Sequence, residues 1–357
     1  MGKGKKLVGL LLAAVMMTSL LAGASPFTGA NALESGQTKE WGKDDLSGLR
    51  AGDTVLFGSY EQDNDLENGA EPIEWIALSV EGDKALLLSK YALERSSYEN
   101  FYDLLERFPD GEGSVDWDAV KITWEECTLR AWLNETFYSM AFTAEQREAV
   151  IETVLENAYN PIYSTDGGND TRDCVFLLTI EDVLNPDYGF DESMFMYDVA
   201  RRCSGTEYVK AQGLWTLDMA YDEGDEGWRD YATAEGEPPC WWWLRSSGED
   251  ESRAAQVHCY GYVSDDYMYD EEGAVRPAIY LDLKSSQPSD PVKKGDVDGD
   301  GQINSKDVTQ LRRYLAGGWN VEINMVNADV NGDGEVNSKD VTILRRFLAG
   351  GWGVVLE

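Results

Sequence analysis

The sequence predicts an α+β central domain of mixed strands and two helices, followed by a small all-α domain. Three observations lead to this prediction. Strand-like runs lie at both ends of residues 44–283, and helical periodicity lies between them. The polar stretch 284–294 is typical of a linker. A sequence unit is then repeated within 295–357, and two copies this short usually fold by packing against each other.

The first residues have the features of a secretory signal peptide. Three lysines precede an apolar run from residue 7 to residue 21, and small-residue cleavage sites follow it. The run is too short to indicate a retained membrane span. We therefore expect residues 1–32 to be removed by cleavage after Ala32, and the mature protein to be secreted and extracellular.

The chain is strongly acidic, with a formal net charge of −36. Residues 1–32 hold three lysines and no acidic residue, so their removal changes −36 to −39. Such a surface repels nucleic acid and anionic membranes, and neither is an expected partner. Because carboxylates are so abundant, a catalytic acid–base pair cannot be chosen from the sequence, and the catalytic residues stay unknown.

Cysteine and histidine give no support for metal or thiol chemistry in the central domain. None of the five cysteines shows C-x-x-C spacing, and they fit either two disulfides with one free thiol or a set of buried thiols. The single histidine, His258, excludes multi-histidine metal sites, and no nucleophile motif accompanies it. The cysteines are Cys127, Cys174, Cys203, Cys240 and Cys259.

The central domain is expected to begin with strands. Residues 53–60 are an apolar strand candidate, and 73–79 and 85–91 read as a hairpin joined by a turn that contains Gly82. Residues 99–121 are mixed and acidic, so we expect a long surface connection there.

Two helices are expected in the middle of the domain. The first starts near Thr123, and the second follows Thr143, which lies three residues before Gln146 as in a capping box. A strand at 174–179 follows, and 181–239 predict an irregular loop with a short helix or two. The apolar residues of the first helix are Trp124, Leu129, Trp132, Leu133 and Phe137, and those of the second are Val150, Ile151, Val154 and Leu155.

Three further strands are expected at 240–246, 254–263 and 274–283. Alternation places Trp241 and Trp243 on one face of the first of these strands. These indoles either fill the core or form a stacking platform for sugar rings, and the core is the commoner role. Arg245 and Arg276 lie among apolar residues, and we expect them to pair with buried acids.

The C-terminal repeat indicates calcium binding. Residues 295–319 and 328–352 are identical at 19 of 25 positions, and each copy carries the calcium-loop pattern D-x-[DN]-x-[DN]-G. Four carboxylates in twelve residues repel one another unless a divalent cation lies between them, and calcium is a hard ion that takes oxygen ligands. The twelfth ligand is Asp rather than the usual Glu, and no helix is expected before either loop. The predicted ligands are Asp296, Asp298, Asp300, Gln302, Asn304, Asp307, Asp329, Asn331, Asp333, Glu335, Asn337 and Asp340, with Gln302 and Glu335 acting through their backbone carbonyls.

These loops, each followed by N-S-K-D-V-T-x-L-R-R, closely resemble a type I dockerin over residues 295–352. The resemblance implies two bound calcium ions, a cohesin domain of a scaffoldin as partner, and a place in a cellulosome that is either free or attached to the cell surface. Because both copies carry the same residues, either helix is expected to be able to dock. The contact positions implied by the resemblance are Ser305, Lys306, Arg312, Arg313, Ser338, Lys339, Arg345 and Arg346.

The central region also resembles a known family. FGSY, TWEECTLRAWLN, DCVFLLT, WWLRS and GAVRPAIYLDL are similar to an uncharacterised family of bacterial extracellular domains. The resemblance implies a C-type-lectin-like fold related to formylglycine-generating, sulfatase-modifying proteins. Those enzymes need a closely spaced cysteine pair, whereas Cys240 and Cys259 are nineteen residues apart. That activity is therefore not expected here.

Three functions stay open for the central domain. It binds carbohydrate or a surface ligand during polysaccharide degradation, it is a polysaccharide-active hydrolase such as a glycosidase, or it has a structural or protein-binding role. An open groove floored by Trp and Tyr would favour binding. Two carboxylates roughly 5–9 Å apart in one cleft would favour a glycosidase.

Overall fold

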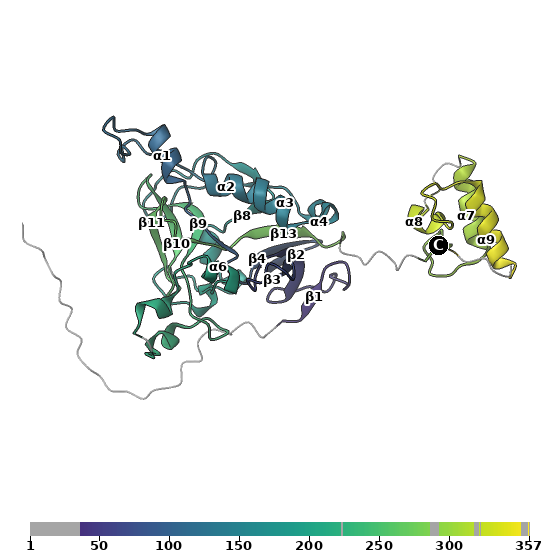
Figure 1. Ribbon diagram of the computed structural model, residues 1–357, viewed down its shortest axis with the longest axis horizontal. Helices are drawn as coiled ribbons and strands as arrows, with labels where there is room; N and C mark the ends of the chain where they lie inside the picture. The colour runs from purple at the N-terminus through teal and green to yellow at the C-terminus, as the bar shows by residue number, and fades with distance from the viewer. Residues whose placement is uncertain are drawn as a thin grey trace, which may run out of the picture. The chain divides into compact units, whose positions relative to one another are not determined.

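The computed structural model describes residues 36–222, 224–285, 293–317, 321, 323–350 and 356. The predicted signal peptide and most of the predicted linker lie outside these residues. We describe the central unit, within 36–285, and the C-terminal unit, from residue 293 onward, separately (Figure 1). Within the described residues, none of the helices has the length and apolar character needed to cross a membrane.

The first sheet of the central unit has six strands in the order β1-β2-β3-β4-β13-β8, antiparallel except for the β1–β2 pair. Its β3–β4 hairpin turns at Gly82, whose φ of 62° favours glycine, and this confirms the predicted hairpin. The strands are β1 (Thr38–Glu40), β2 (Thr54–Tyr60), β3 (Glu71–Glu81), β4 (Lys84–Ser89), β8 (Val175–Phe176) and β13 (Ala278–Asp282).

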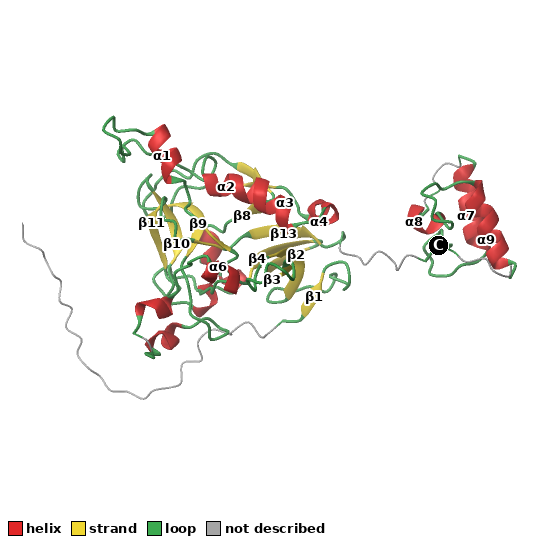
Figure 2. Ribbon diagram, viewed as in Figure 1, coloured by secondary structure: helices red, strands yellow, loops and turns green. Residues whose placement is uncertain are grey.

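The second sheet has the order β11-β10-β9-β12-β5, and a separate two-stranded sheet pairs β6 with β7. In Figure 2, β9, β10 and β11 lie beside one another at the end of the unit opposite β1. The strands are β5 (Glu94–Arg95), β6 (Thr153–Leu155), β7 (Thr171–Asp173), β9 (Trp242–Ser247), β10 (Arg253–Val257), β11 (Val263–Tyr267) and β12 (Ala274–Val275).

Besides the two helices predicted in its middle and the short helices predicted within 181–239, the central unit has α1 within 99–121, and all of its helices are short. Those in its first half lie along one side of the unit (Figure 1). The α-helices are α1 (Phe101–Arg107), α2 (Thr128–Trp132), α3 (Tyr138–Ala141), α4 (Ala144–Ala149), α5 (Ile180–Val183) and α6 (Glu207–Ala211). Leu133–Phe137 form a π-helical turn, and 3₁₀ turns cover Pro186–Tyr188, Val199–Arg201, Leu217–Ala220 and Gly227–Tyr231.

Tryptophan side chains organise the core. Trp75, Trp124, Trp242 and Trp243 are each 0 % exposed. Their indole N–H groups all donate hydrogen bonds of 2.7–3.0 Å, to three backbone carbonyls and to one carboxylate, that of Asp173. These four side chains thus bury large apolar area without leaving their indole N–H groups unpaired. Trp241 is also buried, at 8 % exposed, so the core role predicted for Trp241 and Trp243 is confirmed.

The prediction of a surface connection over 99–121 was wrong in part, because α1 lies within it. Asn100 caps this helix by accepting a hydrogen bond from the Tyr102 backbone N–H at 2.8 Å. Leu104 is the one buried residue of α1, so the apolar periodicity of this helix is weak.

The second predicted helix has the expected capping box between Thr143 and Gln146, but it ends at Ala149. Val150 instead forms a bridge with Leu281 of β13, and Thr153–Leu155 is a strand. The β-branched residues at 150–154 thus follow sheet pairing rather than helical periodicity.

Two other predictions were wrong at the C-terminal end of the unit. The strand expected at 274–283 is split into β12 and β13, which belong to different sheets, because Pro277 lies between them and has no N–H to donate. Arg245 and Arg276 form no ion pair within the described residues. The Nε of Arg276 donates to the Ser89 carbonyl at 2.8 Å, and its guanidinium lies over the Trp242 ring.

The five cysteines are free thiols in the structure, and all but Cys174 are buried. This agrees with the buried-thiol alternative.

The C-terminal unit is helical, as predicted. It contains α7 (Ser305–Leu315), α8 (Met325–Ala328) and α9 (Ser338–Leu348). The short α8 directly precedes the second loop, so the expectation of no helix there was wrong. Val297, Leu311, Ala328, Val330 and Leu344 form a small buried core to which both copies contribute.

Candidate functional site

The first loop of the C-terminal unit gathers carboxylates around one point. Asp296 and Asp307 are 1 % and 0 % exposed, and with Asp298 they offer oxygens that lie within 4.8 Å of one another. Burial, followed by the nearby charges of Asp307, Asp300 and Asp296, raises the pKa of Asp298. Like charges this close favour a cation between them.

The Asp at the twelfth loop position closes the loop onto the following helix. Oδ1 of Asp307 accepts from the backbone N–H groups of Val297 at 2.7 Å and Asp298 at 3.2 Å, and Oδ2 accepts from that of Asn304 at 2.7 Å. Asn304 in turn caps α7. The side chain of Asp307 is one carbon shorter than that of the usual Glu, and its carboxylate therefore lies close to the backbone at both ends of the loop.

The first residue of each loop carries a polar atom that the protein leaves unsatisfied. Oδ2 of Asp296 accepts from the Gly301 N–H at 2.9 Å, and Oδ2 of Asp329 accepts from the Gly334 N–H at 3.1 Å. The Oδ1 atom of each aspartate is buried and has no hydrogen-bond partner among the described residues. A buried, unpartnered carboxylate oxygen is costly unless a cation binds it, so both loops fit calcium.

The second loop repeats this arrangement with one fewer charge at the third position. Asp340 is 0 % exposed, and it accepts from the backbone N–H groups of Val330 at 3.1 Å and Asn337 at 2.8 Å. Asn331 occupies the position of Asp298 and accepts from the Asp333 N–H at 2.9 Å. Both loops turn at the glycine of the sixth position, where φ is 79° in one and 82° in the other.

All eight predicted contact residues are exposed and lie on α7 or α9. Lys306 and Lys339 also reach back to their own loops, with Nζ at 3.3 Å from Oδ2 of Asp300 and 3.1 Å from Oδ2 of Asp333. Gly317 and Gly350 follow the helices with φ near 70°, as helix-ending glycines do. The glycines after them, Gly318 and Gly351, lie outside the described residues.

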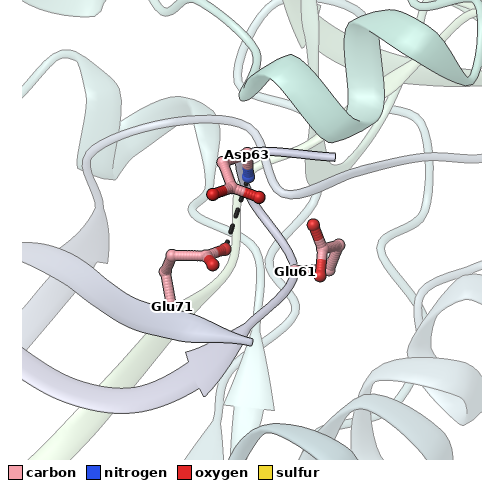
Figure 3. Close-up of side chains that lie close together, drawn as sticks. All are labelled: Glu61, Asp63 and Glu71. Carbon is pink, nitrogen blue, oxygen red and sulfur yellow. Dashed lines mark hydrogen bonds between the residues drawn. The ribbon is translucent and has the colours of Figure 1, made fainter. Parts of the chain in front are cut away.

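Three carboxylates also gather in the central unit, at the start of β3 (Figure 3). Glu61, Asp63 and Glu71 offer oxygens within 4.8 Å of one another. Oε2 of Glu71 accepts from the backbone N–H groups of Gln62 and Asp63, at 2.8 and 3.3 Å. These bonds already hold the loop together, and none of the three side chains is fully buried, so the cluster is not assigned a ligand.

An open pocket of about 500 Å³ lies beside β11, and we call it the aromatic pocket. Trp117 and Tyr269 pack with ring centroids 4.9 Å apart, and Tyr267 stacks on Tyr269 at 5.5 Å. Trp117 is 37 % exposed and Tyr267 is 41 % exposed. The Arg253 guanidinium lies 4.1 Å from the centroid of the Tyr267 ring, so Trp117 offers the clearer ring surface to a ligand. The remaining lining residues are Asp118, Val120, Asp250, Glu251 and Ser252.

Two acids of the aromatic pocket, Asp250 and Glu251, already have partners. Oδ1 of Asp250 accepts from the backbone N–H and the hydroxyl of Ser252, at 2.8 and 2.6 Å, and its Oδ2 lies 3.7 Å from the Arg253 guanidinium. Glu251 lies 3.9 Å from the Lys121 ammonium. This arrangement presents fixed hydrogen-bond acceptors beside stacked rings.

The aromatic pocket was not predicted from the sequence. Trp117 lies in the stretch read as a surface connection, and Tyr267 and Tyr269 lie in an acidic stretch. The spacing of two between the tyrosines was the available signal, because it places two rings on one face of an extended segment.

His258 lies among aromatic rings and beside the buried Cys259 thiol, whose pKa is raised by burial to about 11. Its ring stacks on Tyr262 at 4.5 Å, and burial lowers its pKa. The backbone N–H of Tyr260 and the Cys259 thiol both lie 3.4 Å from its Nδ1. These contacts give His258 a packing role.

Comparison with known proteins identifies two regions. The sequence model of the Domain of unknown function (DUF6273) matches residues 82–283, and that of the Dockerin type I domain matches residues 294–349. No curated protein matches the chain.

Two solved structures contain chains that resemble part of this one. One is a type I cohesin–dockerin complex, Coh-OlpA-Doc918 from Clostridium thermocellum, with 36% identity over 17% of this chain and 97% of that chain, at a TM-score of 0.17. The other is the sixth cohesin of scaffoldin B from Acetivibrio cellulolyticus in complex with a mutant Cel5 dockerin, with 40% identity over 16% of this chain and 92% of that chain, at a TM-score of 0.16. TM-scores this low carry no structural argument.

The C-terminal match agrees with the repeat, its buried aspartates and its two helices. The central match gives no activity, and the predicted C-type-lectin-like fold stays a prediction. Because residues 82–283 are 202 of 357, the chain belongs to the DUF6273 family, and it carries a type I dockerin domain at its C-terminal end.

Proposed function

We propose that this protein is a secreted cellulosome subunit whose dockerin binds a cohesin in a calcium-dependent manner and whose central domain binds polysaccharide. The dockerin domain supports a cohesin-binding subunit of the cellulosome type. The polysaccharide part rests on the aromatic pocket.

The calcium part of the proposal assigns one ion to each loop. The first ion is held by the side chains of Asp296, Asp298, Asp300, Asn304 and Asp307, and the second by their equivalents in the repeat. The carbonyls of Gln302 and Glu335 supply the main-chain ligands. The observation that supports both sites is the buried, unpartnered Oδ1 of Asp296 and of Asp329.

The cohesin part assigns the contact to the exposed residues of α7 and α9. Arg312 and Arg313 lie in the last turns of α7, and Arg345 and Arg346 lie in the same place on α9. Neither pair forms an ion pair within the described part of the chain, so their guanidinium groups are available to acidic groups of a partner.

The polysaccharide part depends on ring surface beside fixed acceptors. Sugar rings present C–H faces that stack on aromatic side chains and hydroxyls that donate to carboxylates. Trp117, Tyr267 and Tyr269 supply the rings, and Asp118 and Glu251 supply acceptors. Because these acids share the pocket with the rings, a glycosidase is the competing function.

A polysaccharide panel tests the central domain. The mature, calcium-loaded chain is assayed for retention on each polysaccharide and for released reducing sugar. We expect retention without release, and we expect Trp117→Ala and Tyr269→Ala each to weaken retention at least tenfold. Tyr102→Ala is the matched control, because Tyr102 is an aromatic residue 75 % exposed that does not line the pocket.

Two outcomes would contradict the binding proposal. Sugar release that is lost on changing Asp118 or Glu251 to an amide would establish a hydrolase. Neither retention nor release on any polysaccharide would leave a structural or protein-binding role.

A further inference from the structure

A second cavity of the central unit contains a buried arginine that forms no ion pair with a carboxylate in the part of the chain that the structure describes. The cavity has a volume of about 320 Å³, and we call it the arginine pocket. Its walls come from β6 and the residues that follow it, the start of α5, the β9 residues Arg245 and Ser246, and Tyr280 of β13. None of its lining residues lines the aromatic pocket.

Arg245 uses only one of its three guanidinium nitrogens. Nη1 donates to the Glu156 carbonyl and to Oδ1 of Asn157, both at 2.7 Å. Nε is shielded from solvent and has no partner, and Nη2 donates no hydrogen bond within the described residues. A guanidinium has five N–H donors, so the whole Nε–Nη2 edge of Arg245 is unpaired.

Arg201 is a buried guanidinium that is fully satisfied by the protein, whereas Arg276, which is 2 % exposed and lines neither pocket, leaves its Nη1 without a partner among the described residues. All three nitrogens of Arg201 donate to backbone carbonyls. The carboxylate of Asp198 lies 3.4 Å from its Nε. Arg245 is 9 % exposed, and its Nε–Nη2 edge has neither backbone carbonyls nor a carboxylate as partners among the described residues.

An unpaired edge on a buried cation is energetically unfavourable. Burial lowers the pKa of Arg245, and the nearby charge of Asp182 opposes this effect. A planar carboxylate can accept two parallel hydrogen bonds from a guanidinium edge and neutralise its charge. The cavity therefore needs an anionic group of this shape beside Arg245.

The rest of the cavity offers acceptors and hydroxyls. Asp182 uses Oδ2 to accept from the Thr179 N–H at 2.8 Å, and its other oxygen has no hydrogen bond within the described residues. Glu181 is exposed at the rim, and Tyr280 adds a phenol. Several separated acceptors suit a ligand with several hydroxyl donors.

We propose that the arginine pocket binds one hexuronate, a sugar ring that carries a carboxylate. The carboxylate binds the Nε–Nη2 edge of Arg245, and ring hydroxyls donate to Asp182 and Glu181. A neutral sugar leaves Arg245 unpaired. Phosphate and dicarboxylates carry a second negative charge, which the two acids repel and Arg245 does not neutralise. An amino acid has a single ammonium group, so it can satisfy only some of the separated acceptors in the pocket. This site is independent of the polysaccharide proposal for the aromatic pocket.

Calorimetric titration of the mature, calcium-loaded chain with glucuronate and glucose tests this proposal. The two sugars differ only in carrying a carboxylate or a hydroxymethyl group. We expect saturable binding of glucuronate and binding of glucose at least about tenfold weaker, because the charged hydrogen bonds are lost. Alanine as the free amino acid is titrated in parallel, and it is expected to bind more weakly than glucuronate.

Two variants locate the binding. Arg245→Met is expected to reduce glucuronate affinity to the level of glucose, whereas Arg172→Met removes the same charge from an exposed residue outside the pocket and is expected to leave affinity unchanged. Val154→Trp blocks the cavity from its rim and leaves Arg245 in place. Val154 is 53 % exposed, so this variant is expected to fold even if Arg245→Met does not.

The proposal is overturned if wild-type protein binds neither sugar or binds both equally, or if alanine binds more tightly than glucuronate. It is also overturned if glucuronate affinity survives in folded Val154→Trp. If Trp117→Ala loses polysaccharide retention but still binds glucuronate, the two pockets bind their ligands independently.

Discussion

The central unit and the C-terminal unit are held together by different interactions. The central unit buries large apolar side chains, including four fully buried tryptophans whose N–H groups are all hydrogen bonded. Among the described residues, the core of the C-terminal unit has five fully buried apolar side chains, none of them aromatic. Beside that core it buries Asp296, Asp307 and Asp340.

Because of this difference, we expect the stability of the two units to depend on different solution conditions. Apolar burial stabilises a fold in proportion to the area removed from water, with no other component needed. Buried carboxylates that face one another destabilise a fold until a cation neutralises them. We therefore expect a central unit that is indifferent to calcium and a dockerin that folds with it.

Calcium removal is the prediction with the largest effect. Chelation is expected to abolish cohesin binding and to unfold α7 and α9, since each site contributes about 4 kcal/mol when free calcium exceeds its Kd a thousandfold. Scanning calorimetry of the whole chain should show one transition that is lost with chelator and one that does not shift. Readdition of calcium serves as the control. A dockerin transition that persists without calcium would remove the distinction between the two units.

Trp243→Ala is the reciprocal change in the central unit. It removes a fully buried indole and leaves the Ser96 carbonyl without its donor at 2.8 Å. We expect the free energy of unfolding of the central unit to fall by about 3–5 kcal/mol. Denaturant titration measures this loss.

The dockerin transition and cohesin affinity should not change in Trp243→Ala. Tyr102→Ala is the control within the central unit, and it should change stability by no more than about 0.5 kcal/mol because Tyr102 is exposed. A shift of the dockerin transition would mean that the two units are energetically coupled.

Glu99 should make the stability of the central unit depend on pH. Burial raises the pKa of Glu99 from 4.5 to about 7, and its Oε1 has no hydrogen-bond partner among the described residues. Between these two pKa values the folded state keeps a proton that the unfolded state has released. Stability should therefore fall as pH rises from about 4.5 to about 7, by at most about 3 kcal/mol and by less if solvent screens the charge.

Glu99→Gln should flatten this dependence, because a neutral amide does not titrate. Glu106→Gln, a change at an exposed position of α1, is the matched control and should keep the slope. Thermal unfolding at a series of pH values makes the measurement. An equal slope in wild type and Glu99→Gln would show that another group is responsible.

The two units also differ in how far the sequence predicts them. The two acidic loops of the dockerin were predictable because the calcium-loop pattern places oxygens at fixed spacing along one short segment. Asp296 to Asp307 therefore contain the whole pattern. The helix before the second loop was missed because Met325–Ala328 is a single turn and is too short to show periodicity.

The central unit was predictable only where its structure is local. The hairpin of β3 and β4 follows from alternation and a glycine turn, whereas the fate of Val150 depends on its bridge to Leu281 far along the chain. The aromatic pocket likewise depends on a contact between residues far apart in the sequence, Trp117 and Tyr269. The unpaired edge of Arg245 can be recognised only from the three-dimensional positions of all the residues around it. Long-range contacts thus define the candidate sites of the central unit.

The internal repeat of the dockerin gives the smallest predicted effect. If α7 and α9 each can dock, replacing Arg312 and Arg313 by alanine removes one of two equivalent binding orientations. Cohesin affinity should then fall only about twofold, which corresponds to about 0.4 kcal/mol. Changing Arg345 and Arg346 alone should give the same result. Changing all four should abolish binding, because no intact helix is left to dock. Calorimetric titration with a cohesin makes the comparison, and a large loss from one pair alone would show that a single helix carries the contact.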